Sequence, residues 1–486
     1  MKKVLAVIGV AILMAAFAVP ASAQFKTYGS MQITGKWVEK QDFNTGLRPG
    51  DRIPGSYGQD ADLTYKNVWQ RFNFFLEYGD PKTVRAVIGF EADSTDWGES
   101  STVQAAQVPG GNDFMGSKNT DKASLGIKVA FIEFMVPNSP LQVTAGIQNF
   151  NYGGRLVESQ DAMGVSVAAL FAPHKITAMW YRINDDPLWG GGSYTTGNYS
   201  GRLAYHVNDF YAVKYDLIQK AFNAQVYFVY NNDLYSGYSG TGGAAPGGWL
   251  GNGVDHPYWV GARATFMPGN WTIYGQFAYK GGKREYDNPA LSELKYSAYA
   301  MELEVKYKIG PGMYVIGEGY YATGNDANSS DKSKMYTVPN GSEAQSNFGL
   351  HKTVFFWMNF NEFDAQHQKD QSIGGKYYLR AAFEYAPVEW LNLILNYLYI
   401  GDTSKGNANG TVQVNSGYAD QWADEDFHGH EINLLAQLKI YESLMLYTGI
   451  GMFLPGDVYK NRSPSLSSPK EPETAYAAAV KLLYAF

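Results

Sequence analysis

The densest group of side chains that could bind a metal ion lies near residue 430. His428 and His430 are two residues apart, and Asp426 precedes His428 by two. On a regular β-strand all three would therefore share one face, and imidazole and carboxylate are common ligands of transition metals. The group also follows directly on an acidic run, so a polar strand end facing water explains it more simply. We expect no metal site and no cofactor.

The other reactive residue types do not form a catalytic arrangement. The acidic stretches 326–331 and 420–426 could attract Ca²⁺, but they lack the regular ligand spacing of a calcium loop. The glycines at 190–192 are not followed by the lysine of a phosphate-binding loop. Histidine and serine are present, yet no Gly-x-Ser-x-Gly elbow occurs. The sequence therefore predicts that the protein is not an enzyme.

The start of the chain has the features of an export signal. Lys2 and Lys3 precede an apolar run over 4–19, and the small-residue site Ala21-Ser22-Ala23 follows it. This run is shorter than the ~20 residues that a spanning helix needs. We expect residues 1–23 to be a cleaved secretory signal peptide and residues 24–486 to form one domain.

Composition narrows the class of protein further. The chain contains 37 Tyr, 53 Gly and 11 Trp, and it has no Cys, which excludes disulfides and thiol chemistry. Beyond the signal, no apolar stretch approaches the ~18 residues of a membrane helix. The net charge of −7 argues against nucleic acid as a partner.

Apolar and polar residues alternate with a period of two in many segments. In 376–385 the residues at odd positions are apolar, whereas the even positions include Lys376, Arg380 and Glu384. The same division recurs in 68–78, 84–91, 301–308, 431–440 and 476–486. An apolar outer face and a polar inner face are typical of transmembrane β-barrel strands. A soluble β-sandwich is compatible with any one of these strands but not with the whole series.

One carboxylate interrupts this alternation. Glu133 stands between Phe131 and Met135, and we assign the face carrying Ile127 and Val129 to lipid. A charge that faces hydrocarbon is costly, so it needs a protein partner or a polar rim. We therefore expect Glu133 to face outward, as one candidate for a contact between subunits.

Short and long connections alternate along the chain. The short ones, rich in Pro and Gly, lie at 79–81, 137–140, 172–175, 267–270, 310–312, 386–388 and 441–443. The long ones lie at about 39–64, 96–120, 184–197, 233–254, 283–293, 324–369, 402–425 and 455–472. This asymmetry predicts an all-β fold, a single antiparallel transmembrane barrel with short periplasmic turns and long extracellular loops. We count about 18 strands, with 16 as the alternative, and the region 198–232 is the least certain.

Several segments resemble the outer-membrane porin family, in particular the homotrimeric porins of sulfate-reducing bacteria. They are the signal peptide, the opening strand 28–35, the segments 146–155, 429–433 and 451–456, and the terminal Phe486. The resemblance implies an outer-membrane protein that forms homotrimers, contacts lipid and lipopolysaccharide, and reaches the barrel assembly machinery through Phe486.

In porins the loop after the fifth strand folds into the barrel and narrows it. The resemblance places this loop at about 150–162, where the charged residues are Arg155, Glu158 and Asp161. Wall charges that could face it are Arg71, Arg85, Arg182, Arg202, Arg380 and Glu384. One alternative is that these charges are scattered over a wide lumen. Another is that the longer loop 324–369, with Phe355, Trp357 and Phe360, folds inward in place of 150–162.

These features predict a passive, water-filled channel for small hydrophilic solutes and ions, with weak ion selectivity. A substrate-selective channel for a sugar or an organic anion is the alternative within transport. A plugged barrel that serves as a surface anchor or adhesin is the alternative outside it.

Overall fold

The computed structural model describes residues 24–39, 65–96, 114–115, 123–154, 156–184, 206–235, 253–286, 292–324, 331–338, 352–355, 374–403, 426–457 and 472–486. The expected signal peptide lies outside the described residues. Within the described ranges, no helix is long and apolar enough to cross a membrane.

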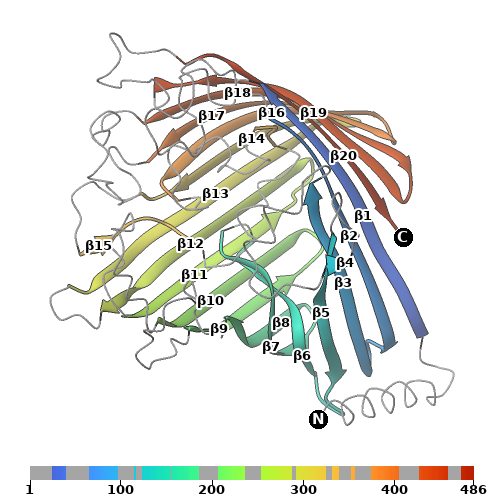
Figure 1. Cartoon of the computed structure of the whole chain (residues 1–486), viewed down its shortest axis with the longest axis vertical. Coiled ribbons are helices and arrows are strands. Elements are labelled where there is room, and N and C mark those ends of the chain that lie inside the picture. The colour runs from blue at the N-terminus through green and yellow to red at the C-terminus, as the bar shows by residue number, and fades with distance from the viewer. Residues whose placement is uncertain are drawn as a thin grey trace, which may run out of the picture.

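Eighteen long strands pair with their neighbours in an antiparallel sheet, and β1 pairs with β20 to close it (Figure 1). The long strands are β1 (Gln24–Glu39), β2 (Tyr65–Asp80), β3 (Val84–Asp96), β5 (Ala123–Met135), β6 (Leu141–Tyr152), β7 (Glu158–Phe171), β8 (His174–Asn184), β9 (His206–Ile218), β10 (Phe222–Tyr235), β11 (Gly253–Phe266), β12 (Trp271–Tyr286), β13 (Leu294–Gly310), β14 (Met313–Ala322), β16 (Lys376–Val388), β17 (Leu391–Asp402), β18 (Phe427–Tyr441), β19 (Leu444–Pro455) and β20 (Ala475–Ala485). Two further strands, β4 (Phe114–Met115) and β15 (Lys332–Ser333), have two residues each. The closed 18-strand barrel is confirmed, and the alternative of 16 strands is wrong.

Most short turns lie where the sequence predicts them. Six of the seven proposed turns overlap the connection between two consecutive strands, from β2–β3 to β18–β19, whereas 386–388 are the last residues of β16 and the turn to β17 follows at 389–390. Gly269 and Gly312 adopt positive φ there, a conformation that glycine reaches without steric cost. An eighth turn, at 219–221, joins β9 and β10 within the region that the sequence left uncertain. We call this side of the barrel the short-turn end.

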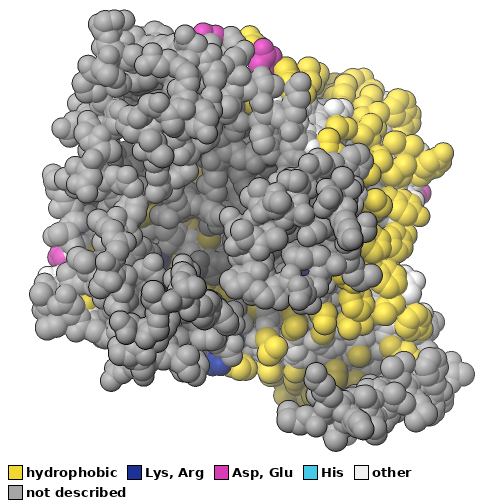
Figure 2. Space-filling model, viewed as in Figure 1, with side chains coloured by type: hydrophobic (Ala, Val, Ile, Leu, Met, Phe, Trp, Pro, Cys, Tyr) yellow, Lys and Arg dark blue, Asp and Glu magenta, His cyan; other side chains and the backbone are white. Residues whose placement is uncertain are grey.

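The outer surface carries large apolar side chains. Among the most exposed are Leu303 on β13 and Leu379 on β16, at 54% and 58%. The inward neighbours Glu302 and Arg380 are buried. Figure 2 shows hydrophobic side chains gathered on the side of the barrel where Figure 1 places β1 and β20. The alternation therefore sorts apolar residues outward and charges inward, as predicted.

The expected position of Glu133 is wrong because β5 contains a bulge. Gly89 of β3 pairs with Val129 and the next residue, Phe90, pairs with Ile127, so Lys128 is an extra residue. One extra residue reverses the faces of a strand beyond it. Ile127 and Ile132 therefore face outward, whereas Glu133 faces the lumen, where it accepts a hydrogen bond from Arg85 Nε at 2.7 Å.

Candidate functional site

The β6–β7 hairpin leaves the barrel wall at its end opposite the short turns. Pairing of β6 with β5 stops at Ile147, and pairing of β7 with β8 stops at Met163. The two strands still pair with each other up to Tyr152 and Glu158. Residues 148–162, which we call the inner hairpin, are thus a two-stranded ribbon without neighbouring wall strands.

The inner hairpin is held by side chains of strands further around the barrel. Lys214 Nζ on β9 donates to the Asn151 carbonyl at 3.1 Å, and the Gly153 amide donates to Gln225 Oε1 on β10 at 3.0 Å. Gly153 and Gly154 both have positive φ, which turns the ribbon back within five residues. These contacts place the tip inside the lumen.

Aromatic rings of the inner hairpin pack against aromatic rings of the barrel wall. Phe150 stacks on Tyr181 with 4.2 Å between ring centroids, and Tyr181 stacks on Phe210 at 4.9 Å. Tyr152 also contacts Tyr181 through their hydroxyl groups. All four side chains are buried. Burial of such large rings favours the inward position of the hairpin.

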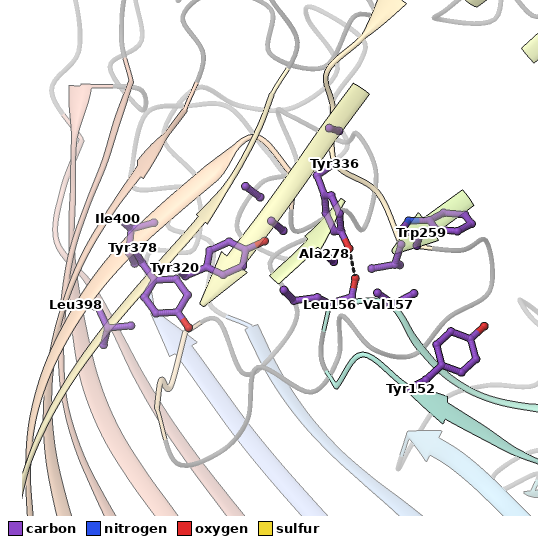
Figure 3. Packing of buried hydrophobic residues seen from close by; sticks show 14 of the residues in the cluster. Tyr152, Leu156, Val157, Trp259, Ala278, Tyr320, Tyr336, Tyr378, Leu398 and Ile400 are labelled. Atoms are coloured by element: carbon purple, nitrogen blue, oxygen red, sulfur yellow. Dashed lines mark hydrogen bonds between the residues drawn. The ribbon is translucent and has the colours of Figure 1, made fainter. Parts of the chain in front are cut away.

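A second inward segment, 331–338, meets the tip of the inner hairpin. The Tyr336 hydroxyl donates to the Leu156 carbonyl at 2.5 Å, and both side chains are fully buried (Figure 3). Trp259 Nε1 on β11 donates to the Thr337 carbonyl at 3.0 Å. Complete burial raises the pKa of Tyr336 well above its ordinary value, so the hydroxyl keeps its proton and remains a donor.

A third inward segment, residues 352–355, is bound by a carboxylate of the wall. We call it the strap. Glu431 on β18 is fully buried and accepts hydrogen bonds from the Val354 amide at 2.6 Å and the Thr353 hydroxyl at 2.5 Å. Phe355 packs against Phe453 with 5.7 Å between centroids. The strap therefore lies against β18 and β19 inside the barrel.

Lys352 connects the strap to a group of carboxylates on β13 and β14. Its ammonium group lies 2.9 Å from Glu302 Oε1 on β13 and also contacts Glu318 on β14. Arg380 on β16 binds the other oxygen of Glu318 at 2.8 Å and lies 3.5 Å from Glu304. Buried charges are tolerated when they are paired and hydrogen-bonded, as here. The strap is thus fixed by ion pairs on one side and by Glu431 on the other.

A cavity of about 540 Å³ lies in the lumen between the inner hairpin, the strap and the wall. Its wall includes Gly154 of the inner hairpin and Lys352 of the strap. The remaining polar lining comes from the wall strands and includes Arg263, Tyr274, Glu302, Glu304, Lys306, Arg380 and Glu384. This volume lies within the range of small-molecule sites.

Of the predicted pore residues, Arg380 and Glu384 line this cavity. Glu384 pairs with Lys306 at 2.5 Å. Arg71 and Arg85 lie on the inner face of the facing wall, where Arg71 is 3.8 Å from Glu91 and Arg85 binds Glu77 and Glu133. Arg85 is close to the short-turn end and therefore lines the mouth of the lumen.

The predicted inward loop at 150–162 coincides with the inner hairpin, although most of it is paired strand and the turn spans only 153–157. Asp161 lies on this hairpin, 3.0 Å from Lys128 Nζ. Arg155 and Arg202 lie outside the described residues. For Glu158 only the backbone, paired with Tyr152, is described.

Arg182 does not line the pore, in contrast to the prediction. It shares the outward face of β8 with Ile176 and Trp180, while Tyr181 points inward. Its guanidinium group forms two hydrogen bonds, of 2.8 and 2.9 Å, with Asp209, which shares the outward face of β9 with the exposed Tyr211. Mutual pairing reduces the cost of placing both charges on the outer surface.

The two histidines near residue 430 do not share a face. Gly429 has a φ of 139°, and the ladder between β17 and β18 is irregular at this point. His428 is buried beside Asp402 at 2.9 Å, whereas His430 stacks on the outward Tyr397. Among the described residues, no group of three potential ligands could hold a metal ion.

Sequence reasoning placed Glu302, Glu304 and Glu431 on inner faces but did not identify their partners. Those partners, Lys352, Thr353 and Val354, come from the long connection between β14 and β16. The expectation that this connection folds inward holds for 331–338 and 352–355, whereas Trp357 and Phe360 lie outside the described residues.

No protein-family model matches the chain, and no curated protein is significantly similar to it. Solved structures with a similar fold include OccAB3 of Acinetobacter baumannii, with a TM-score of 0.50, 8% identity and coverage of 95% of this chain and 99% of that one. OccAB4 of the same organism gives 0.49, 10%, 96% and 100%, and OpdK of Pseudomonas aeruginosa, solved with vanillate, gives 0.49, 9%, 95% and 98%. At these identities the likeness concerns the fold alone. With its apolar outer band, this fold is that of an outer-membrane β-barrel.

Proposed function

We propose that this protein is an outer-membrane channel that selects small hydrophilic solutes at a cavity in its lumen. The observation that carries the proposal is a cavity of about 540 Å³ in the lumen, which is lined by the inner hairpin, the strap and the wall strands. A lumen narrowed in this way favours a substrate-selective channel over a wide diffusion pore.

The charges of the cavity support weak discrimination between cations and anions. Lys306 pairs with Glu384, Lys352 with Glu302, and Arg380 with Glu304, so most of the lining charge is neutralised locally. Arg263 is different, because it forms no ion pair with any carboxylate that the structure describes. A solute would therefore be selected mainly by size and hydrogen bonding, with a modest attraction for negative groups at Arg263.

Planar-bilayer recording of the purified protein tests this function. We expect steps of low conductance, a reversal potential close to zero in a salt gradient, and transient blocking when a permeating sugar or organic acid is added. Large steps that no small solute blocks would indicate free diffusion instead. Correctly folded protein that gives no steps would favour a plugged barrel acting as an anchor or adhesin.

We propose further that the channel is a homotrimer embedded among lipid and lipopolysaccharide, and that the assembly machinery recognises Phe486. The resemblance to porins supports this assembly. Conductance steps grouped in threes, together with crosslinked trimers on gels, would support the trimer. A monomer band alone after crosslinking, together with conductance steps that occur singly, would contradict the trimer.

A further inference from the structure

We propose that Lys128 is a positioning residue that sets where the inner hairpin stands in the lumen. The proposal rests on the proposed channel function, because it concerns the element that narrows the pore. It starts from two features that lie side by side on β5, a bulge and the end of the pairing with β6. Lys128 is the extra residue of the β5 bulge, and this bulge lies just beyond Ala130, where β6 stops pairing with β5.

The Lys128 ammonium group joins the wall to the hairpin. Its Nζ lies 3.1 Å from Glu91 Oε2 on the inner face of β3 and 3.0 Å from Asp161 Oδ2 on the hairpin. Asn149 on the paired strand donates to the other oxygen of Asp161 at 3.1 Å. One cation thus bridges a carboxylate of the wall and a carboxylate of the element that leaves it.

The bulge explains how a side chain of β5 can reach both partners. In a regular strand, the side chain of residue 128 would stand perpendicular to the sheet and pack beside its cross-strand neighbour. As an inserted residue next to the place where β6 departs, Lys128 has no cross-strand partner on β3, and its side chain extends toward the base of the hairpin. The irregularity that reverses the faces of β5 therefore also provides the anchor.

Loss of Lys128 would affect the two carboxylates differently. Arg71 lies 3.8 Å from Glu91 and would still compensate its charge. Asp161 would lose the cation that pairs with it. Its carboxylate would then lie about 6 Å or less from that of Glu91, because Glu91 Oε2 and Asp161 Oδ2 are each about 3 Å from Lys128 Nζ. Like charges at this separation repel, so the base of the hairpin should move away from β5.

The test combines a position readout with a conductance readout. The chain has no cysteine, so Val157→Cys introduces a single thiol at the tip of the hairpin, where the native side chain is fully buried. In this background, Lys128→Met should raise the rate of labelling by a methanethiosulfonate reagent by about ten-fold, and Lys128→Arg should restore protection. Lys128→Met should also change the single-channel conductance and increase its noise. Leu156→Cys, equally buried, is the second labelling site if Val157→Cys folds poorly.

Lys26→Met is the matched control, because it removes another lysine that pairs with a carboxylate, Glu77, but does not touch the hairpin. It should leave labelling unchanged. Unchanged labelling and conductance in Lys128→Met, or failure of arginine to restore protection, would overturn the proposal. If the parent protein gives no conductance while Lys128→Met still exposes the thiol, the positioning role stands and the channel function fails.

Discussion

Replacing Glu431 by alanine should release the strap from the wall. The fully buried carboxylate accepts hydrogen bonds from the Val354 amide at 2.6 Å and the Thr353 hydroxyl at 2.5 Å. A buried donor that loses its acceptor costs about 1–3 kcal/mol, so two donors together cost about 2–6 kcal/mol. Even the lower figure reduces the ratio of docked to undocked strap about 30-fold. Asn433 Nδ2 also donates to Glu431, at 2.7 Å, but its loss costs less, because the same amide donates to the Lys352 carbonyl as well.

Hydrogen exchange measured on the folded protein reports this change directly. The Val354 amide donates to Glu431, and its exchange with solvent should accelerate by at least about 30-fold in Glu431→Ala. Glu431→Gln should have an intermediate effect, because the amide oxygen can still accept from Val354 while the amide nitrogen cannot. Single-channel conductance should rise in the same order.

Glu384→Ala is the control for this experiment. Glu384 is another carboxylate of the lumen, but its contacts are Lys306 and Asn392 and not the strap. Its replacement should leave exchange at Val354 unchanged. If Glu431→Ala exchanges at the parental rate, the hydrogen bonds to Glu431 do not hold the strap, and the reasoning is wrong.

Four further results are expected. Val354→Cys with Gly451→Cys should oxidise to a disulfide, seen as a mobility shift on non-reducing gels, because Val354 Cβ lies 3.4 Å from an ideal Cβ at Gly451, close to the ~3.8 Å of disulfides. Arg263→Gln should move the reversal potential in a salt gradient toward cation preference, whereas an unchanged potential would mean that Arg263 is compensated. Tyr336→Phe removes the hydrogen bond to the Leu156 carbonyl, worth about 1 kcal/mol, and should raise the conductance without altering heat stability on gels. Since burial raises the pKa of Tyr336, its hydroxyl should still donate at about pH 10, where an exposed tyrosine begins to lose its proton. Phe486→Ala should lower the amount of folded protein in outer membranes, with Phe25→Ala, another exposed aromatic residue, as the control that keeps the parental amount.

Strand positions and faces follow from the sequence wherever one face is clearly polar. On β16, Leu379 and Arg380 alternate between lipid and lumen as the pattern predicts. On β8 both faces are largely apolar, and the charge of Arg182 suggested the lumen. The structure shows instead that a neighbouring carboxylate, Asp209, neutralises it on the outside, and this pairing joins strands whose connecting segment spans more than 20 residues.

Two kinds of information are absent from local patterns. The first is the insertion of a single residue, because nothing in the sequence distinguishes Lys128 from a regular strand residue, and yet it reverses the face of Glu133. The second is the partner of a buried charge. Lys352 lies in a long connection without periodicity, and its position depends on Glu302 and Glu318, which are more than 30 residues away. The inward position of the inner hairpin was predictable only through the porin resemblance.

The inner hairpin is an extension of two wall strands, and this makes the width of the passage adjustable without rebuilding the barrel. The hairpin departs after Ile147 and returns at Met163, so residues added in pairs between these positions lengthen a ribbon that no other strand must match. Each added pair would advance the tip by about 3.3 Å, and an even number per strand would keep its faces in register. Insertions and deletions in this ribbon would therefore change the size of the molecules that can pass. The number of strands, the outer surface and the route of assembly would stay the same, which makes the ribbon a suitable site of change for evolution and for protein engineering.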